Sequence, residues 1–200
     1  MRRDEFNIND KNSIDEILQA CEYGTLSLIN NDRPYSVALN FVYHNGSIYF
    51  HGSIEGKKMD TIKTNNLACF LVVKPYSTIP SHFFDTVAAC PATQFFASVF
   101  VEGDLSFVEN KDKKAEVLNA LMKKLQKEGG YEEISYDKKM YTKMLDNVAV
   151  IELKVENISC KIKVGQNLNY EKRDKLFEKL ENRASKIDIE TIKEMKFYKK

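Results

Sequence analysis

Tryptophan is absent from this chain of 200 residues, and glycine, proline and cysteine are scarce, with eight, four and four copies. Neither sign of charge is in excess, because 30 lysines and arginines are set against 29 acidic residues and the formal net charge is +1. That balance gives no reason to expect a nucleic acid or an anionic membrane as a partner. The length suits one domain, or one domain with an appendage, around a buried core.

Long apolar runs are also missing. The longest, residues 87–101, is interrupted by polar residues and Pro91, and no run approaches the ~20 residues that a bilayer-spanning helix needs. The first five residues, Met1-Arg2-Arg3-Asp4-Glu5, contain no apolar segment. We therefore expect neither a secretory leader nor a membrane partner.

The four cysteines lie far apart, and no Cys-x-x-Cys or Cys/His cluster has zinc spacing, so we expect no metal site. Cys21, Cys69 and Cys160 show no pairing pattern, which favours a reducing, cytoplasmic environment. Cys69 and Cys160 fall in strand patterns, where a thiol behaves as a small apolar group. Cys90 stands beside Pro91 in an expected loop, and it is either a reactive thiol or an inert one.

A hairpin followed by a short helix is the most informative pattern in the chain. Residues 35–43 alternate between apolar and polar side chains, as in a half-buried strand. Asn45-Gly46 predicts a tight turn, and residues 47–50 form the return strand. We expect Ser53 to cap the next helix, with Gly56 leaving room for a ligand.

The doublet Lys57-Lys58 follows at the start of that helix. Alone, such a doublet is typical of a solvated helix face. Here the hairpin places the end of its return strand beside the two lysines at the helix start. Unpaired helix N–H groups and the helix dipole attract anions at that position. The pattern favours a phosphate site.

The rest of the chain predicts mainly strands. Residues 13–21 read as a helix with a capping box at 13–16, and the charged segment after Tyr170 is helical in pattern. That segment is a helix on the barrel, a dimer arm or a mobile extension. Further strands are expected at 25–29, 67–73, 95–108, 148–153 and 158–162, with a helix at 113–128 and a partly helical stretch at 131–145.

Two stretches stand out. Residues 74–91 contain three prolines and are expected to form a long, functional connection. Residues 95–101 are apolar on both faces, although an antiparallel sheet usually keeps one face in water. Contact with a partner subunit would explain why the second face of residues 95–101 is also apolar. Six antiparallel strands with an inserted helix fit a small closed barrel, a mainly β fold.

At these residues the chain resembles a known family. Residues 40–66 are similar to the flavin-binding split-barrel superfamily of pyridoxamine 5'-phosphate oxidase, most closely to the branch of nitroimidazole-resistance proteins. The resemblance covers residues 1–168 and leaves 169–200 as a charged helical extension. It implies a six-stranded antiparallel split β-barrel with Greek-key topology and flanking helices. The motifs are Phe50-His51-Gly52-Ser53, Gly56-Lys57-Lys58-Met59, Lys63-Thr64-Asn65-Asn66, Ala89-Cys90, residues 97–103 and residues 152–161.

The resemblance implies FMN at a homodimer interface, with a site shared between the subunits. Lys57 and Lys58 match the basic pair at the phosphate, and Ser98 matches a polar residue that reaches the flavin from the neighbouring subunit. The absence of a dinucleotide-binding glycine motif agrees with FMN rather than FAD. His51 and Gly52 would flank the ring and the ribityl chain, and Ser53 is also expected to bind the cofactor. The residues expected along the ring are Val37, Ala38, Leu39, Asn40 and Phe41.

His51 has three interpretations. It contacts the flavin or a substrate as a hydrogen-bond donor or acid, it is a strand-end histidine bonded to a backbone carbonyl, or it is an axial haem ligand as in some split-barrel relatives. The founding oxidase carries a C-terminal Trp and basic residues that this chain lacks, so oxidation of pyridoxamine phosphate is not expected.

The leading hypothesis is therefore an NAD(P)H-dependent flavin reductase of a small electrophile, such as a nitroaromatic or quinone. The alternative is a non-enzymatic flavin- or haem-binding module.

Overall fold

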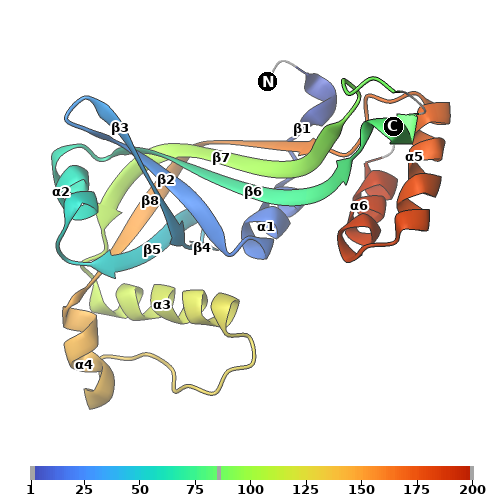
Figure 1. Ribbon diagram of the computed structural model, residues 1–200. Coiled ribbons are helices and arrows are strands. Elements are labelled where there is room, and N and C mark those ends of the chain that lie inside the picture. The colour runs from blue at the N-terminus through green and yellow to red at the C-terminus, as the bar shows by residue number, and fades with distance from the viewer. Residues whose placement is uncertain (1–2, 85–86, 199–200) are drawn as a thin grey trace. The chain divides into compact units, whose positions relative to one another are not determined.

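The computed structural model describes residues 3–84 and 87–198 (Figure 1). Eight strands of these residues form one sheet in the order β3-β2-β6-β7-β8-β5-β4, with β1 beside β8. Each pairing with a defined register is antiparallel. The strands are β1 (Asn7–Ile8), β2 (Tyr23–Asn30), β3 (Arg33–Asn40), β4 (Val42–His44), β5 (Ser47–Ser53), β6 (Leu67–Ile79), β7 (Thr93–Phe107) and β8 (Val148–Lys163).

The predicted class, a mainly antiparallel split barrel with flanking helices, is confirmed. The strand path is open, running from β3 at one edge to β4 at the other. The helices are α1 (Lys11–Ala20), α2 (Lys57–Thr64), α3 (Lys111–Leu125), α4 (Lys139–Asp146), α5 (Tyr170–Arg183) and α6 (Lys186–Phe197), with 3-10 turns η1 (Asp4–Phe6) and η2 (Ser81–Phe84). No helix of the described residues is long and apolar enough to span a membrane.

Internal contacts divide the chain into two compact units, which we describe separately. The central unit comprises Asp15–Val72 and Val99–Ile158. The terminal unit comprises Met1–Ile14, Val73–Ser98 and Ser159–Lys200. The expected boundary at residue 168 concerns domain organisation, and it stays a prediction.

Two hairpins shape the central unit, and their turns have the expected chemistry. Asn31 and Asp32 adopt φ of 50° and 59° between β2 and β3, and Asn45 and Gly46 adopt 50° and 85° between β4 and β5. Asn, Asp and Gly tolerate these positive values, which tight hairpin turns require. The expected single strand 35–43 is wrong in one respect, because it breaks at Phe41 into β3 and β4.

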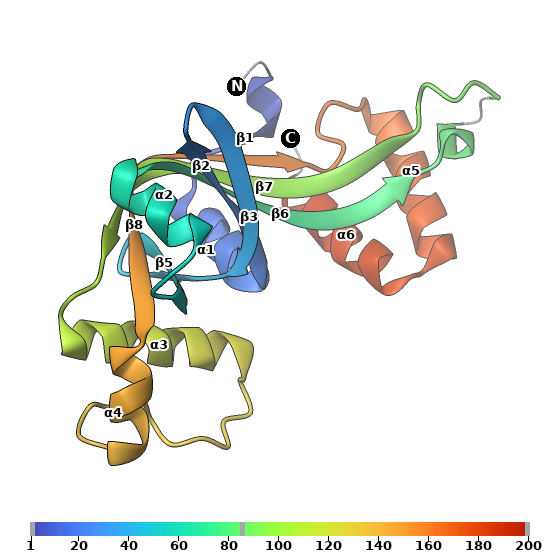
Figure 2. The same cartoon turned by 60° about the vertical axis from the view of Figure 1, so that its left-hand side comes forward.

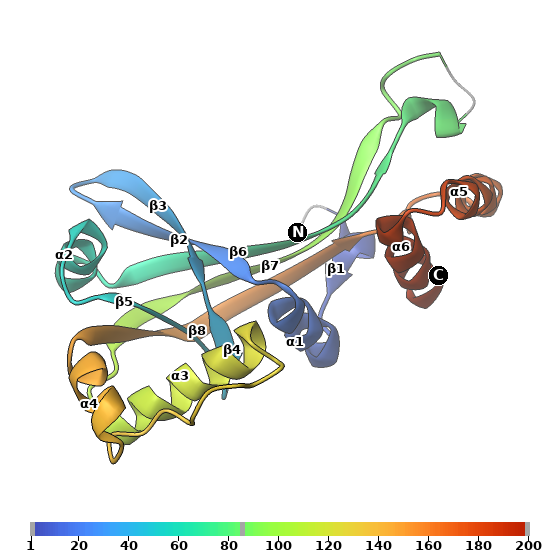
Figure 3. The ribbon, with the colours of Figure 1, turned by 60° about the horizontal axis from the view of Figure 1, so that its bottom comes forward.

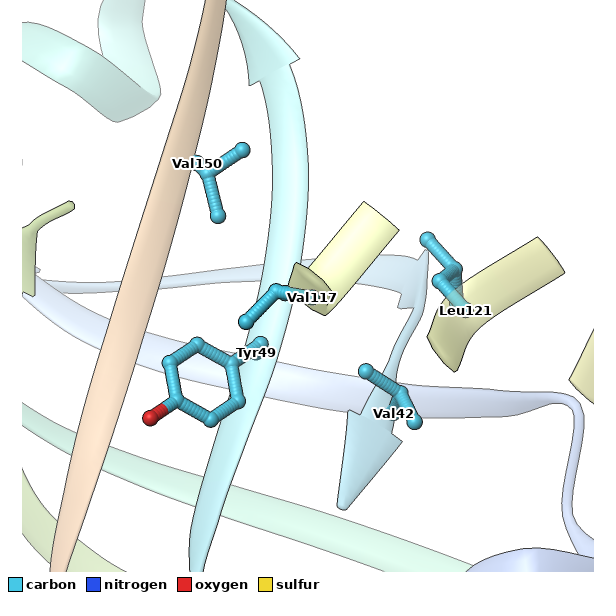
Figure 4. Packing of buried hydrophobic residues seen from close by; sticks show 5 residues of the cluster. All are labelled: Val42, Tyr49, Val117, Leu121 and Val150. Atoms are coloured by element: carbon cyan, nitrogen blue, oxygen red, sulfur yellow. The ribbon is translucent and has the colours of Figure 1, made fainter. Parts of the chain in front are cut away.

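The core beneath β4 and β5 is closed by α3, which contacts β4. Its buried side chains come from strands and helix alike, and the alternation of the strands supplies one apolar face. Asn110 caps the start of the helix, because its side chain accepts a hydrogen bond from the Lys113 N–H. The helix ends at Leu125, before the expected end at residue 128. Figure 4 shows Val42 of β4, Tyr49 of β5, Val117 and Leu121 of α3, and Val150 of β8.

Three long strands, β6, β7 and β8, pass from the central unit into the terminal unit. The expectation of a long connection at 74–91 is wrong over its first part, since β6 continues to Ile79 and η2 follows. Residues 85 and 86 of that stretch lie outside the described residues. The exposed Pro75 lies inside β6. The two strands expected between 148 and 162 are one strand, β8.

The terminal unit contains α5 and α6, which pack side by side (Figure 2). Asp188 of α6 is fully buried and accepts a hydrogen bond from the Ser77 hydroxyl of β6 at 2.5 Å. Its ion pair with Arg183, together with bonds from Ser185 and Ser77, lowers the pKa of the Asp188 carboxyl. The charge is therefore satisfied inside the unit, and it fixes α6 to β6.

The expected capping box at 13–16 is wrong by one turn. α1 begins at Lys11, and the Asp10 carboxylate accepts hydrogen bonds from both the N–H and the hydroxyl of Ser13 at 2.8 Å. Aspartate is as good an N-cap as serine, so Asp10 takes the position.

Gly103 marks a close approach of two strands, and Gly103→Ala is expected to lower the free energy of unfolding by about 1–3 kcal/mol. A Cβ there would lie 1.9 Å from the backbone carbonyl oxygen of Lys154, which cannot rotate aside. Chemical denaturation measures the change. Glu102→Ala, at the exposed neighbouring position, is the control and is expected to stay within about 0.5 kcal/mol. Equal stability of Gly103→Ala and wild type would contradict the close approach.

Candidate functional site

The candidate site of the central unit lies where α2 begins, directly after β5. Figures 1 and 3 show α2 between the β2–β3 hairpin and the end of β5. The expected cap, Ser53, is wrong: it ends β5, and its hydroxyl accepts a hydrogen bond from the Glu55 N–H at 3.2 Å. Gly56 precedes the helix instead, with φ 107°, a conformation that favours glycine.

Lys57 and Lys58 point toward two different strands. The Lys57 Nζ lies 4.4 Å from the centre of the Tyr35 ring of β3, and the Lys58 Nζ lies 5.3 Å from the centre of the Phe50 ring of β5. Rings of this kind attract cations by their quadrupole. The start of α2 therefore contacts both β3 and β5 through these two lysines. The sequence predicted the position of the lysines but not their contacts with the rings.

Neither lysine forms an ion pair with a carboxylate of the described residues. Lys58 is half-buried, and desolvation lowers the pKa of its amine. A cation that is partly removed from water without a counter-charge is costly, and a bound anion offsets that cost. The pair is suited to a phosphate.

Gly52 makes room for the Lys58 amine. A Cβ at position 52 would lie 2.9 Å from the Lys58 Nζ and 3.4 Å from the Met59 methyl carbon. The missing side chain thus leaves the end of β5 open to the amine.

His51 is exposed at the end of β5, and its backbone pairs with Val150 of β8. Partial desolvation, followed by the charge of Lys58, lowers the pKa of the His51 imidazole below its ordinary 6.5. The ring is therefore neutral at pH 7, with one N–H donor and one acceptor nitrogen.

Replacing Lys58 by methionine is expected to raise the pKa of His51, yet leave it below 6.5, because the charge is removed while desolvation remains. The ring signals followed by NMR across a pH titration measure it. Lys57→Met is the matched control, since Lys57 does not contribute to the shift. A pKa of His51 that is unchanged in Lys58→Met would contradict the proximity.

The expected ring contacts of β3 divide between two faces. Val37 and Leu39 pair with Leu26 and Gly24 of β2 and share the face that turns inward. Ala38 and Asn40 are on the other face, where the Asn40 amide donates to the Glu22 carbonyl at 3.1 Å. Of the described strands only β2 pairs with β3, so half of the β3 backbone groups face away from the sheet.

Phe41 is the one predicted contact that is completely buried. Its ring packs edge-to-face against Phe70 with centres 5.0 Å apart, and the Lys124 Nζ lies 3.6 Å from its centre. The same amine donates to the carbonyls of Leu18 and Phe41 at 2.9 and 3.0 Å. Desolvation lowers the pKa of Lys124 to about 8. Phe41 thus fixes the end of β3 from inside the core.

Ser98 lies on β7 in the terminal unit and is half-buried. The central unit therefore brings together the residues of β3, β5 and α2, and Ser98 is not among them. Within the described part of the chain, no group of three or more His, Cys, Asp or Glu side chains is placed to hold a metal ion.

Comparison with known proteins identifies relatives of this arrangement. A family model described as pyridoxamine 5'-phosphate oxidase matches residues 10–162. A candidate 5-nitroimidazole antibiotic resistance protein from Bacteroides thetaiotaomicron is 22% identical with a TM-score of 0.65, over 78% of this chain and 86% of that one.

Two further solved structures are similar in fold. A flavocytochrome from Azotobacter vinelandii is 21% identical with a TM-score of 0.67, over 79% of this chain and 69% of that one. A FAD- and haem-binding protein from Mycobacterium smegmatis is 14% identical with a TM-score of 0.66, over 78% and 73%. At these identities the likeness establishes the fold. No curated protein sequence matches the chain.

Proposed function

Since the chain belongs to the pyridoxamine 5'-phosphate oxidase family, we propose that it binds FMN and acts as an NAD(P)H-dependent reductase of a small electrophile, such as a nitroaromatic or a quinone. One observation carries the proposal: Lys58 is half-buried and desolvated, beside Gly52 and without a carboxylate partner among the described residues. A dianionic phosphate is the complement that this amine lacks.

The remaining residues fit the other parts of FMN. Val37 and Leu39 offer an apolar surface for the flat ring, and the backbone groups that face away from β2 near Leu39 and Asn40 suit its polar edge. Lys57, the neighbour of Lys58 in the first turn of α2, would provide a second positive charge for the phosphate. Ala38, Gly52 and Ser53 lie next to these contacts along the same strands, and Phe41 supports the end of β3 from the core.

Bound FMN would supply two-electron transfer from NAD(P)H to the acceptor. The chain's own residues would hold the phosphate, orient the ring and exclude water from its face. His51 would act as the catalytic residue of the protein, because its neutral imidazole can donate one N–H to the ring edge or to a substrate above it.

A homodimer with a shared flavin site is part of the proposal. In the central unit the neighbouring strands β6, β7 and β8 expose Leu71, Phe100 and Ile158 at 39%, 37% and 38%. The opposite face of β7 is buried, as at Val99 and Val101. Apolar side chains on adjacent strands favour a partner, and one self-complementary patch is used twice in a two-fold dimer. Ser98 would reach the flavin from the partner subunit.

A cytoplasmic location also belongs to the proposal. None of the four cysteines, all of which lie in the described part of the chain, forms a disulfide; Cys21 and Cys160 are buried and Cys90 is exposed. Free thiols persist in reducing compartments.

The alternative is a non-enzymatic flavin- or haem-binding module. The names of the flavocytochrome and of the FAD- and haem-binding protein favour it. His51 is the exposed imidazole of the central site that would ligate a haem iron from one side.

The absorption spectrum of the purified protein, before and after addition of FMN or haem, separates these functions. A two-band yellow spectrum that NAD(P)H bleaches, and that an added nitroaromatic or quinone restores, is the expected result. A stable flavin spectrum without bleaching indicates the binding module, and a Soret band indicates haem. Failure to take up FMN would overturn the flavin proposal.

A further inference from the structure

A pocket of about 530 Å³ lies within the terminal unit, and none of the residues of the FMN site lines it. Its walls come from the segment before η1, the loop that leads into β7, the end of β8 and the start of α5. This volume falls in the range of small-molecule sites. The polar lining consists of Arg3, Cys90, Thr93, Lys163, Asn167 and Lys172.

The charge of this lining has one sign. Arg3, Lys163 and Lys172 reach the pocket, and no acidic residue of the described chain lines it. The Lys163 amine donates a hydrogen bond to the Thr93 hydroxyl. Desolvation, followed by the charges of Lys161 and Arg3, lowers the pKa of Lys163, so cations crowd here. A carboxylate oxygen of Glu5, which does not line the pocket, lies 4.0 Å from the Arg3 guanidinium.

The other wall is apolar. Phe84, Pro91, Phe95 and Leu168 line it together with Ala92. Gly165 adopts φ +84° in the turn after β8, where a Cβ would lie 3.2 Å from both the Phe95 ring and Leu168. The turn thus brings the apolar side chains close to the end of β8, which carries Lys163.

We propose that this pocket binds a small organic anion, with a phosphate or carboxylate head at Arg3, Lys163 and Lys172 and an apolar body against Phe95 and Leu168. Charge-assisted bonds from lysine and arginine are the strong contacts for such heads. The volume exceeds what an inorganic ion needs, and the apolar wall gives the rest of the ligand a surface. The proposal is independent of FMN binding, because it uses other residues.

Cys90 provides a reporter for this pocket. Its thiol lines the wall and is exposed, whereas Cys21 and Cys160 are buried. A ligand in the pocket covers the thiol and slows its alkylation. Peptide mass spectrometry follows Cys90 separately from the half-buried Cys69.

The experiment measures the rate at which iodoacetamide alkylates Cys90 in the full chain, with increasing phenyl phosphate, benzoate or benzyl alcohol. We expect saturable protection by at least one of the two anions, and the stronger of them identifies the head group. Neutral benzyl alcohol is expected to give little protection. Lys163→Gln/Lys172→Gln is expected to raise the concentration for half-protection by about tenfold or more.

Two controls sharpen the test. Lys175→Gln removes one positive charge about one turn beyond Lys172 on α5, outside the lining, and is expected to leave protection unchanged. Protection is also expected to persist in Lys57→Ala/Lys58→Ala, which separates this pocket from the FMN site. The proposal is overturned if millimolar anions give no protection, if benzyl alcohol protects equally well, or if protection depends on Lys57 and Lys58 rather than on Lys163 and Lys172.

Discussion

Replacing both Lys57 and Lys58 by alanine is expected to weaken FMN binding by about a hundredfold or more. Each charge-assisted hydrogen bond to a phosphate contributes about 1.5–3 kcal/mol, and the exposure of Lys57 places its contact at the lower end. Lys58 is half-buried beside Gly52, so its loss carries the larger share. Fluorescence titration of the apoprotein with FMN measures the change.

The same double variant is expected to keep its thermal stability, or to gain some. Neither lysine has a carboxylate partner among the described residues, and removing the desolvated Lys58 relieves a cost of the folded state. Lys63→Ala, in the last turn of the same helix, is the matched control and is expected to bind FMN like wild type. If Lys57→Ala/Lys58→Ala binds FMN as tightly as wild type, the phosphate lies elsewhere. If it unfolds, the lysines are structural.

The sequence predicted the elements that depend on local chemistry. The turn between β4 and β5 follows from the need for positive φ, which Asn45 and Gly46 meet. The presence of a short helix after this hairpin, with Lys57 and Lys58 in its first turn, could also be predicted. The strand patterns predicted a small barrel, and the resemblance at 40–66 implied that it is a split barrel.

The predictions were wrong where the secondary structure depends on residues outside the local sequence pattern. The break at Phe41 depends on a buried ring and on Lys124, which comes 83 residues later and binds the Phe41 carbonyl. Pro75 suggested a loop, but its place inside β6 is exposed, and proline is tolerated in a strand where its missing N–H is not needed. Serine is a favoured N-cap residue, which is why Ser53 was expected to cap α2. Gly56, with its positive φ, precedes the helix instead, and α2 begins at Lys57.

In the candidate site, too, contacts between sequence neighbours could be predicted and contacts between distant residues could not. Lys57, Lys58, Gly52 and His51 are neighbours in sequence, so their proximity could be predicted. The Tyr35 ring under Lys57 belongs to another strand, and its contact follows from the packing of α2 on the sheet. Neither the periodicity nor the spacing of the sequence predicts the contact between Tyr35 and Lys57.

If the protein forms the proposed homodimer, Phe100→Asp is expected to convert it into a monomer and to abolish FMN retention in the same step. Phe100 is 37% exposed on β7 between strands that expose Leu71 and Ile158. A carboxylate at this position would have to be desolvated without a partner, twice in a two-fold interface, which outweighs the apolar contact it replaces. Light scattering gives the mass, and the absorbance ratio of flavin to protein gives the FMN content after gel filtration.

The control is Leu125→Asp, which places the same charge at a side chain of similar exposure, 42%, on α3 rather than on the sheet face. It is expected to stay dimeric and to retain FMN. A Phe100→Asp monomer with wild-type circular dichroism and no flavin supports a site completed by the partner subunit, because Phe100 itself belongs to none of the proposed phosphate contacts. A wild-type monomer that holds stoichiometric FMN would defeat the shared site, since all the flavin contacts would then have to come from one chain.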